Sequence, residues 1–325
     1  MNIHSLKYLR VAVLVGIALA CGGAEAQTYP AKQLRVVVPF PAGGGADIAI
    51  RTIAPHLSET LGQPVVIDNR PGASGNIGTQ IVAQAAPDGY TLLGTYSAFA
   101  SNEALDMKVP FGVKDFAPIT LLAVTPTVFV VNRSMPVKTL KDLIALAKKR
   151  PGEILYASVG AGTPPHLSAE LFNMMAGIRM THVPYKGGPP ALVAVISGEA
   201  QATFVAVSIA LPHIKADKLR PLAIASSARL KALPDIPTID ESGLRGYEAD
   251  AWYALLAPVR TPQAVIAQLH REAVKALQRR DVRETYLSQM NVEPSPSSPE
   301  QLAALIRSDI DKWSKVVKAT GTRVD

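Results

Sequence analysis

Apolar and polar positions in the first half of the chain alternate between two periodicities. Short apolar runs predict strands, and runs with helical spacing predict helices, in the order strand 34–39, helix 47–61, strand 64–68, helix 77–86 and strand 90–95. In the first helix the apolar positions recur every three to four residues, and Pro55 should kink or split it. This alternation predicts an α/β unit with a mostly parallel sheet flanked by helices.

A second unit of the same kind follows a long apolar run at 121–131, which Thr125-Pro126 interrupts. We interpret that run as a crossing from one domain to the next. The elements after it are predicted at 139–149, 153–158, 164–176, 180–184, 189–197, 201–207 and 219–225. Another long apolar run at 247–258 should return the chain, so that C-terminal helices near 262–279, 281–289 and 299–319 pack on the first unit.

Two crossings between two α/β units predict a two-lobed body that can close on a ligand. The first lobe would contain residues 27–123 plus 250–325, and the second lobe residues 124–249. The alternative is one large α/β domain without a working cleft.

The N-terminal segment 1–26 has the pattern of a secretory signal peptide. Lys7 and Arg10 form its basic head, an apolar core follows at 11–20, and Ala24-Glu25-Ala26 predicts cleavage after Ala26. The apolar core is about half the roughly 20 residues that a membrane span needs, so export to the periplasm is favoured over an uncleaved anchor. Cys21 raises the alternative of a lipoprotein, but the residues before it fit a lipobox poorly.

Composition narrows the class of partner. Cys21 is the single cysteine, so the mature chain should have no thiol, no disulfide and no thiolate metal site. The formal charge of +7 falls to +6 on cleavage, because two basic residues and one acidic residue leave. The excess is spread along the chain without a dense basic run, which argues against nucleic acid and fits mild attraction of anions.

The segment 34–51 carries the strongest chemical signal, because a buried-type strand runs into a glycine-rich turn and a helix start. Phe40 and Ala42 would supply apolar walls, while Pro41, Gly43 and Gly44 shape a turn with free N–H groups. Asp47 would cap the helix. No Lys-Ser/Thr follows the glycines and no G-x-G-x-x-G is present, so a small carboxylate is favoured over a nucleotide.

Two further segments of the first unit are candidates for the same site. The turn at 69–78 is rich in glycine and has Asn76 or Ser74 as its expected helix cap; a tight surface turn is the equal alternative. Thr95 and Ser97 lie at the end of a predicted strand, where open parallel sheets bind ligands.

The second unit repeats the glycine-rich turn at 157–166, ASVGAGTPPH. Thr163 is expected as N-cap with two prolines in the first helical positions, so that Ser158, Gly162, Thr163 and His166 would face the ligand from the opposite side. Tyr185 and Lys186 would lie at the same rim. N–H-rich turns facing each other across a hinge suit a molecule with negative charge.

Sequence motifs of catalysis are missing. There is no H-E-x-x-H, no G-x-S-x-G and no cysteine in the mature chain, and the histidines are scattered. We therefore predict a protein that is not an enzyme and has no metal or other cofactor. A hydrolase assembled from distant residues stays open as an alternative.

Eight blocks of the chain, in order, resemble the Bug proteins, the substrate-binding subunits of tripartite tricarboxylate transporters. They are PFPAGGGAD (39–47), NRPGASGNIG (69–78), PDGYTLL (87–93), GAGTPPHL (160–167), HVPYKGGPPAL (182–192), LRPLAIASSAR (219–229), LPDIPTIDESGL (233–244) and the Trp252 to Pro258 segment. The resemblance implies a periplasmic binding protein of two α/β lobes, expected as a monomer, that closes on a small carboxylate and delivers it to a membrane permease.

In that family the turn after the first strand and its counterpart in the second lobe hold the ligand carboxylates. The resemblance places these roles on 40–44 and 162–166, with Thr95 and Ser97 as side-chain donors. Members that take amino acids have an Asp after the equivalent of Phe204, where this chain has Val205. A mono- or dicarboxylate without an amine is therefore favoured. A periplasmic hydrolase or isomerase, or a receptor for a signalling partner, are the alternatives.

Overall fold

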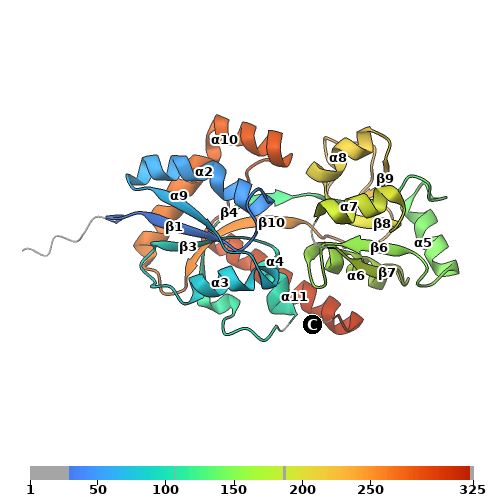
Figure 1. Ribbon diagram of the computed structural model, residues 1–325, viewed down its shortest axis with the longest axis horizontal. Coiled ribbons are helices and arrows are strands. Elements are labelled where there is room, and N and C mark those ends of the chain that lie inside the picture. Colours follow the sequence, from blue (N-terminus) through green and yellow to red (C-terminus); the bar gives the residue numbers. More distant parts are fainter. Residues whose placement is uncertain (1–28, 106, 186–187, 323–325) are drawn as a thin grey trace, which may run out of the picture.

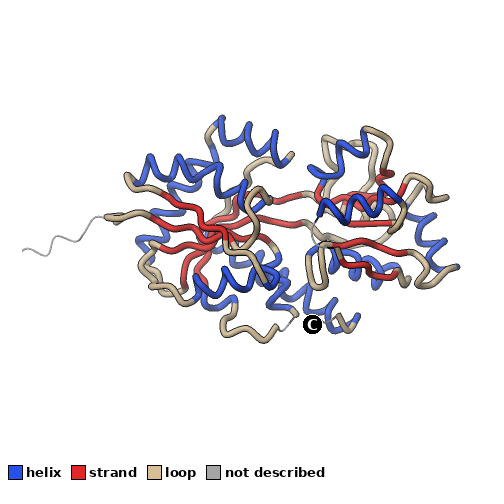
Figure 2. Tube along the Cα trace, viewed as in Figure 1, coloured by secondary structure: helices blue, strands red, loops and turns tan. Residues whose placement is uncertain are grey.

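Two five-stranded sheets form the centres of two lobes in the computed structural model, which describes residues 29–105, 107–185 and 188–322 (Figures 1 and 2). The predicted signal peptide, Cys21 and Lys186 lie outside the described residues. The predicted two-lobed α/β fold is confirmed.

The first sheet has the strand order β2-β1-β3-β10-β4. Its strands are β1 (Leu34–Val38), β2 (Val65–Asn69), β3 (Thr91–Tyr96), β4 (Phe116–Thr125) and β10 (Ala251–Pro258). β1 pairs in parallel with β2 and β3, whereas β10 is antiparallel to β3 and β4.

The second sheet repeats this plan with the order β7-β6-β8-β5-β9. Its strands are β5 (Thr127–Asn132), β6 (Leu155–Ser158), β7 (Thr181–Pro184), β8 (Ala202–Ala206) and β9 (Leu219–Ile224). β6 is parallel to β7 and β8, and β5 is antiparallel to β8 and β9. Four of the five described strands in each sheet run in the same direction, so the predicted mostly parallel sheets are confirmed. Each sheet is nevertheless mixed, because the strand entering from the other lobe, β10 or β5, runs against its neighbours.

Helices cover both faces of each sheet (Figure 1). Their bounds in the first lobe are α2 (Gly45–Leu61), η1 (Ala73–Gly75), α3 (Asn76–Ala83), α4 (Ala98–Ala104), η2 (Val113–Asp115), α9 (Gln263–Gln278), α10 (Arg280–Thr285) and η3 (Tyr286–Met290). Those in the second lobe are α5 (Leu140–Lys149), α6 (Pro164–Ala176), α7 (Gly188–Ser197) and α8 (Val207–Lys215). α2 continues through Pro55 without being split, and its apolar face packs on the first sheet as predicted.

The last helix, α11 (Pro299–Thr320), packs on both lobes. Its first half places Leu302 and Ile306 against Trp252 of the first lobe, whereas Trp313 and Val316 belong to the core of the second lobe. The prediction that the C-terminal helices pack on the first unit therefore holds for α9 and is incomplete for α11.

The two lobes are joined where the chain crosses between the sheets. β4 ends at Thr125 and β5 begins at Thr127, with only Pro126 between them, and Ala251 at the start of β10 pairs with Thr125. These adjacent strands form the hinge. Within the described ranges, the structure contains no helix with the length and apolar character of a membrane span.

Candidate functional site

A cleft between the lobes consists of two connected compartments. The wide compartment has a volume of about 520 Å³ and lies between the start of α2, the Gly72–Gly75 segment and Thr163 of the second lobe. The narrow compartment has a volume of about 160 Å³ and lies over the hinge, against α6, α7, β8 and α8. Tyr96, Val159, Gly188 and Tyr253 line both compartments, so the two are continuous.

The N-terminus of α2 faces the wide compartment. Gly44 is the N-cap, and the N–H groups of Gly45, Ala46 and Asp47 have no acceptor among the described residues. Gly44, Gly45 and Ala46 line the compartment. Three free amides at the positive end of a 17-residue helix form a site with affinity for an anion.

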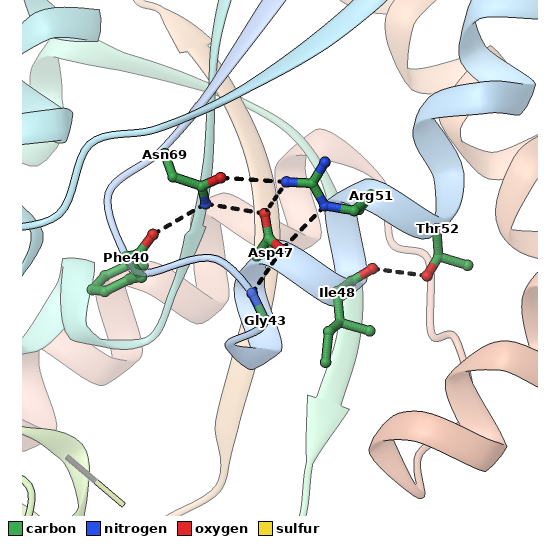
Figure 3. A network of polar contacts seen from close by, with 7 residues as sticks. All are labelled: Phe40, Gly43, Asp47, Ile48, Arg51, Thr52 and Asn69. Atoms are coloured by element: carbon green, nitrogen blue, oxygen red, sulfur yellow. Dashed lines mark hydrogen bonds and ion pairs between the residues drawn. The ribbon is translucent and has the colours of Figure 1, made fainter.

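Asp47 orders this turn without acting as the helix cap, so the predicted cap role is wrong. Its buried carboxylate accepts hydrogen bonds from the Gly43 N–H (2.9 Å), from Arg51 and from Asn69, as Figure 3 shows. Burial raises the pKa of Asp47, but these hydrogen bonds outweigh it, and the pKa is lowered overall. The negative charge of the Asp47 carboxylate is therefore compensated by Arg51, and its hydrogen bond with the Gly43 N–H keeps that amide from facing the cleft.

Tyr96 and Tyr253 form the floor of the cleft where its compartments meet. Burial raises the pKa of both phenols, so both hydroxyls keep their protons at neutral pH. The Tyr96 ring packs edge-on against Phe40, with centroids 4.5 Å apart. Our sequence analysis missed these two residues, although Tyr253 lies in the crossing run 247–258 and Tyr96 directly follows the predicted strand 90–95, between the candidates Thr95 and Ser97.

The turn of the second lobe offers fewer donors than we expected. Thr163 is the N-cap and lines the wide compartment, but its hydroxyl donates to the Gly160 carbonyl at 2.6 Å. Pro164 and Pro165 have no N–H group, and the Gly162 N–H donates to His166 Nδ1 at 2.9 Å. The free amides on this side are those of Val159, Ala161 and His166, for which the described residues provide no acceptor.

Both lobes therefore use the same local device. A turn glycine donates its N–H to the side chain four residues later, Gly43 to Asp47 and Gly162 to His166. His166, which we expected to face the ligand, and Asp47, which we expected to cap the helix, instead fix the backbone of their turns.

His166 belongs to a cluster with Ser158, which is also buried, and with His182, which is partly buried. The two imidazole rings stack with centroids 3.9 Å apart, and His182 Nε2 lies 2.6 Å from the Ser158 hydroxyl. Burial, and then repulsion from His182, lower the pKa of His166 to about 3, so it is neutral. Ser158 is fully buried and none of the three lines the cleft, which separates the cluster from any molecule bound there.

Of the other expected site residues, Phe40 and Pro41 line the wide compartment, whereas Ala42 does not. Thr95 lines a further cavity of about 160 Å³ in the first lobe, with Asn76, Asn102 and Glu103; this cavity shares Phe40 and Ser74 with the wide compartment. The buried Ser97 hydroxyl has no hydrogen-bond partner among the described residues. Tyr185 donates to Glu199 at 2.9 Å, away from the cleft.

The second turn of the first lobe also differs from expectation. Gly75, and neither Ser74 nor Asn76, is the N-cap of α3. Gly72, Ser74 and Gly75 line the wide compartment, and Ala73 and Ser74 have the positive φ angles of 46° and 54°. The turn thus contributes a wall to the cleft through an unusual backbone conformation.

Among the described residues that line the two compartments, none carries a formal charge. The described part of the chain also contains no group of three or more His, Cys, Asp or Glu side chains suited to a metal ion. Backbone amides and hydroxyl groups therefore dominate the polar chemistry of the cleft.

Comparison with known proteins adds independent evidence. The family model of the tripartite tricarboxylate transporter family receptor matches residues 49–322. The chain is 37% identical to protein BugT of Bordetella pertussis, over 98% of this chain and 100% of BugT.

Solved structures give the same result. A protein of R. palustris determined with adipate is 35% identical, with a TM-score of 0.80 over 91% of this chain and 99% of that chain. MatC from Rhodopseudomonas palustris, with bound malate, is 32% identical, with a TM-score of 0.78 over 89% of this chain and 100% of that chain. The resemblance found in the sequence is thereby confirmed: this chain belongs to the family of tripartite tricarboxylate transporter receptors that includes the Bug proteins.

Proposed function

We propose that this protein is a periplasmic receptor that binds a small organic carboxylate between its two lobes and delivers it to a membrane permease. Family membership supports the receptor role, and the relatives determined with adipate and with malate support the ligand class. The single observation that carries the proposal is the N-terminus of α2, whose three free amides face a cleft lined by uncharged residues.

In this proposal the carboxylate binds the amides of Gly45, Ala46 and Asp47. A hydrogen bond to a charged group contributes about 1.5–3 kcal/mol, and a helix N-terminus adds about 0.3–1 kcal/mol or more when partly buried. Micromolar affinity corresponds to about 8 kcal/mol. Three amides and one helix end are therefore sufficient without an arginine clamp.

The lobes would close over the ligand by bending at the hinge. Phe40, Pro41 and Gly44 from the first lobe and Thr163 from the second line the wide compartment, which supports a contact role for them. Gly43, Gly162 and His166 would act by holding the two turns in shape. Thr95, Ser97, Ser158 and Tyr185 are left without a direct contact in this proposal.

Two properties of the whole chain belong to the same proposal. Cleavage after Ala26 would release the mature protein into the periplasm, and N-terminal sequencing of secreted material tests it. The lobes would comprise 27–123 plus 250–325 and 124–249, with α11 as an element shared by both cores.

The experiment that tests the function is a ligand panel of organic acids, nucleotides and sugars, read by thermal unfolding. Saturation at a hundredfold excess over Kd stabilises a protein by about 2.7 kcal/mol. For a chain of this size we expect a shift of several degrees with one or more acids. A shift with a nucleotide or a sugar, and with none of the acids, would refute the proposed ligand class.

An enzyme acting on similar acids is the competing function. The Ser158–His182 pair has the composition of a nucleophile and its base, but Ser158 is buried and neither residue lines the cleft. We therefore propose binding without conversion. Incubation of bound acids with catalytic amounts of protein, followed by mass spectrometry, should detect no product; turnover would overturn this part. A binding assay of the liganded protein with the permease and with a sensor protein separates transport from signalling. Binding to the permease supports transport.

A further inference from the structure

We propose that the ligand has one anionic head and an apolar body, and that the narrow compartment receives that body. This inference rests on the proposed function, because it takes the carboxylate to lie at the start of α2. It names the chemical class of the acid.

The walls of the narrow compartment are apolar. Side chains from four elements of the second lobe and from the hinge surround it, including Val159, Pro165, Leu192, Val205, Ile209 and Ala251. No charged side chain is present among its described lining residues. A carboxylate or an ammonium group placed here would lose its hydration without gaining a counter-charge.

Polar groups in the second-lobe wall are largely satisfied by the protein. The hydroxyl of Ser168 donates to Pro164 O at 2.8 Å, and that of Thr203 donates to Ala157 O at 2.9 Å. The Val207 N–H at the start of α8 donates to Pro126 O at 3.0 Å. The two prolines at the start of α6 have no N–H group to offer. The free N–H groups that remain at this end of the cleft are those of Ser208 and Ile209 at the start of α8, and apolar side chains surround them.

The size of the compartment limits the apolar body. Its volume is about 160 Å³. An apolar cavity of roughly 150 Å³ holds one benzene molecule. One six-membered ring or an alkyl chain of a few carbons would fill the compartment.

The geometry also orients the ligand. Tyr96 and Tyr253 lie at the junction of the compartments, next to the turn that holds Gly45. A carboxylate at α2 would lie beside these hydroxyls, and the rest of the molecule would extend over the tyrosine rings toward Leu192 and Val205. The rival arrangement places a second carboxylate at the start of α8, where the N–H groups of Ser208 and Ile209 have no acceptor among the described residues.

Calorimetric titration with hexanoate and adipate decides between these arrangements, because the two acids have the same number of carbons. We expect hexanoate or benzoate to bind at least about tenfold more tightly than adipate or malate, since only the former pair places an apolar end in the compartment. Tighter binding of adipate or malate would overturn the inference and leave the proposed function intact. If none of the four acids binds, both the inference and the proposed carboxylate function are contradicted for these acids.

Two variants locate the apolar body. Ile209 lines the narrow compartment and is 42% exposed, and Val193 on α7 is 62% exposed and does not line it. Ile209→Asp should weaken hexanoate binding by about tenfold or more, because it places a charge against the alkyl chain. Val193→Asp introduces the same charge elsewhere on the second lobe and should leave the affinity unchanged. If both variants bind hexanoate with the same affinity as the wild type, the alkyl chain does not lie in the narrow compartment and the inference is overturned.

Discussion

At the residue scale, Gly45 is the position where the cleft tolerates least change. A Cβ atom added at Gly45 would lie 2.0 Å from the Tyr253 hydroxyl oxygen and 2.6 Å from the ring carbon that carries it. The neighbouring Gly44 has a φ of −74°, and its nearest contact for a Cβ is Pro41 O at 3.3 Å. Glycine at 45 therefore lets the start of α2 approach the tyrosine floor.

We predict that Gly45→Ala weakens carboxylate binding by at least about tenfold and lowers the free energy of unfolding by about 1–3 kcal/mol, as overpacking does. Gly44→Ala, one residue away on the same turn, should change both quantities much less. Titration calorimetry and thermal unfolding of the two variants measure the effects. Comparable losses in both variants would mean that any side chain in this turn is harmful and that the Tyr253 contact has no special role.

Gly43 shows why the spacing of residues in the sequence was not sufficient to assign every amide of the site. A Cβ there would meet no atom within 4 Å, and its φ of +78° is the reason for glycine. From the sequence, we expected its N–H to face the anion. That N–H is instead bound to Asp47, a contact that depends on the side-chain direction of a residue inside the helix.

At the scale of elements, α11 connects the two lobes. Trp252 of β10 donates its indole N–H to Asp309 at 2.7 Å, and Lys312 lies 2.8 Å from the other oxygen of the same carboxylate. Asp309 is buried, and four residues further along the helix Trp313 enters the core of the second lobe. The helix is thus anchored beside the hinge by a buried polar contact.

We predict that Asp309→Ala lowers the free energy of unfolding by about 1–3 kcal/mol, because it leaves the buried Trp252 N–H without an acceptor. The matched control is Asp311→Ala, an exposed position on the same helix. Chemical denaturation measures both. Equal stability of the two variants would show that the Trp252–Asp309 contact does not hold the helix in place.

At the scale of the whole molecule, the hinge contains a partly buried carboxyl group. Asp250 precedes β10 and accepts hydrogen bonds from the Ser226 hydroxyl at 2.6 Å and from the Thr127 N–H at 3.4 Å. Burial is the main cause of a pKa raised to about 6; the two hydrogen bonds and Lys312 oppose the rise, and Glu248 adds to it. The folded protein thus binds this proton more tightly than the unfolded chain, whose Asp pKa is about 3.9.

Asp250 should therefore reduce stability as the pH rises. Below about pH 4 the group is protonated in both states, and between about pH 4 and 6 only the unfolded state releases the proton, so the free energy of unfolding falls. Above about pH 6 the loss is complete. We predict that Asp250→Asn, which retains an accepting oxygen, is more stable than the wild type at pH 8 by on the order of 2 kcal/mol, and equally stable near pH 4.

Thermal unfolding of wild type and variant across this pH range measures the difference. A constant difference between the two proteins at all pH values would refute the raised pKa and leave only a structural effect of the substitution.

The sequence by itself determined most of the succession of strands and helices, the two crossings and the glycine-rich turn that faces the cleft, whereas α4 and α8 were not predicted. Those features depend on local periodicity and on turn residues, which are readable over a few positions. The start of α6 at Pro164 and its N-cap Thr163 are of this kind. The antiparallel direction of β10 and β5 within the otherwise parallel sheets was not predicted, because it depends on contacts with strands far away in the sequence.

Only the tertiary structure decided which donors are free and which walls the ligand meets. Asp47 and His166 bind backbone amides of their own turns, and Tyr96 and Tyr253 come from strands separated by more than 150 residues yet paired side by side. The apolar compartment is formed by four elements of one lobe and the hinge. Such a surface depends on packing in three dimensions, since no stretch of the chain contains more than a few of its residues.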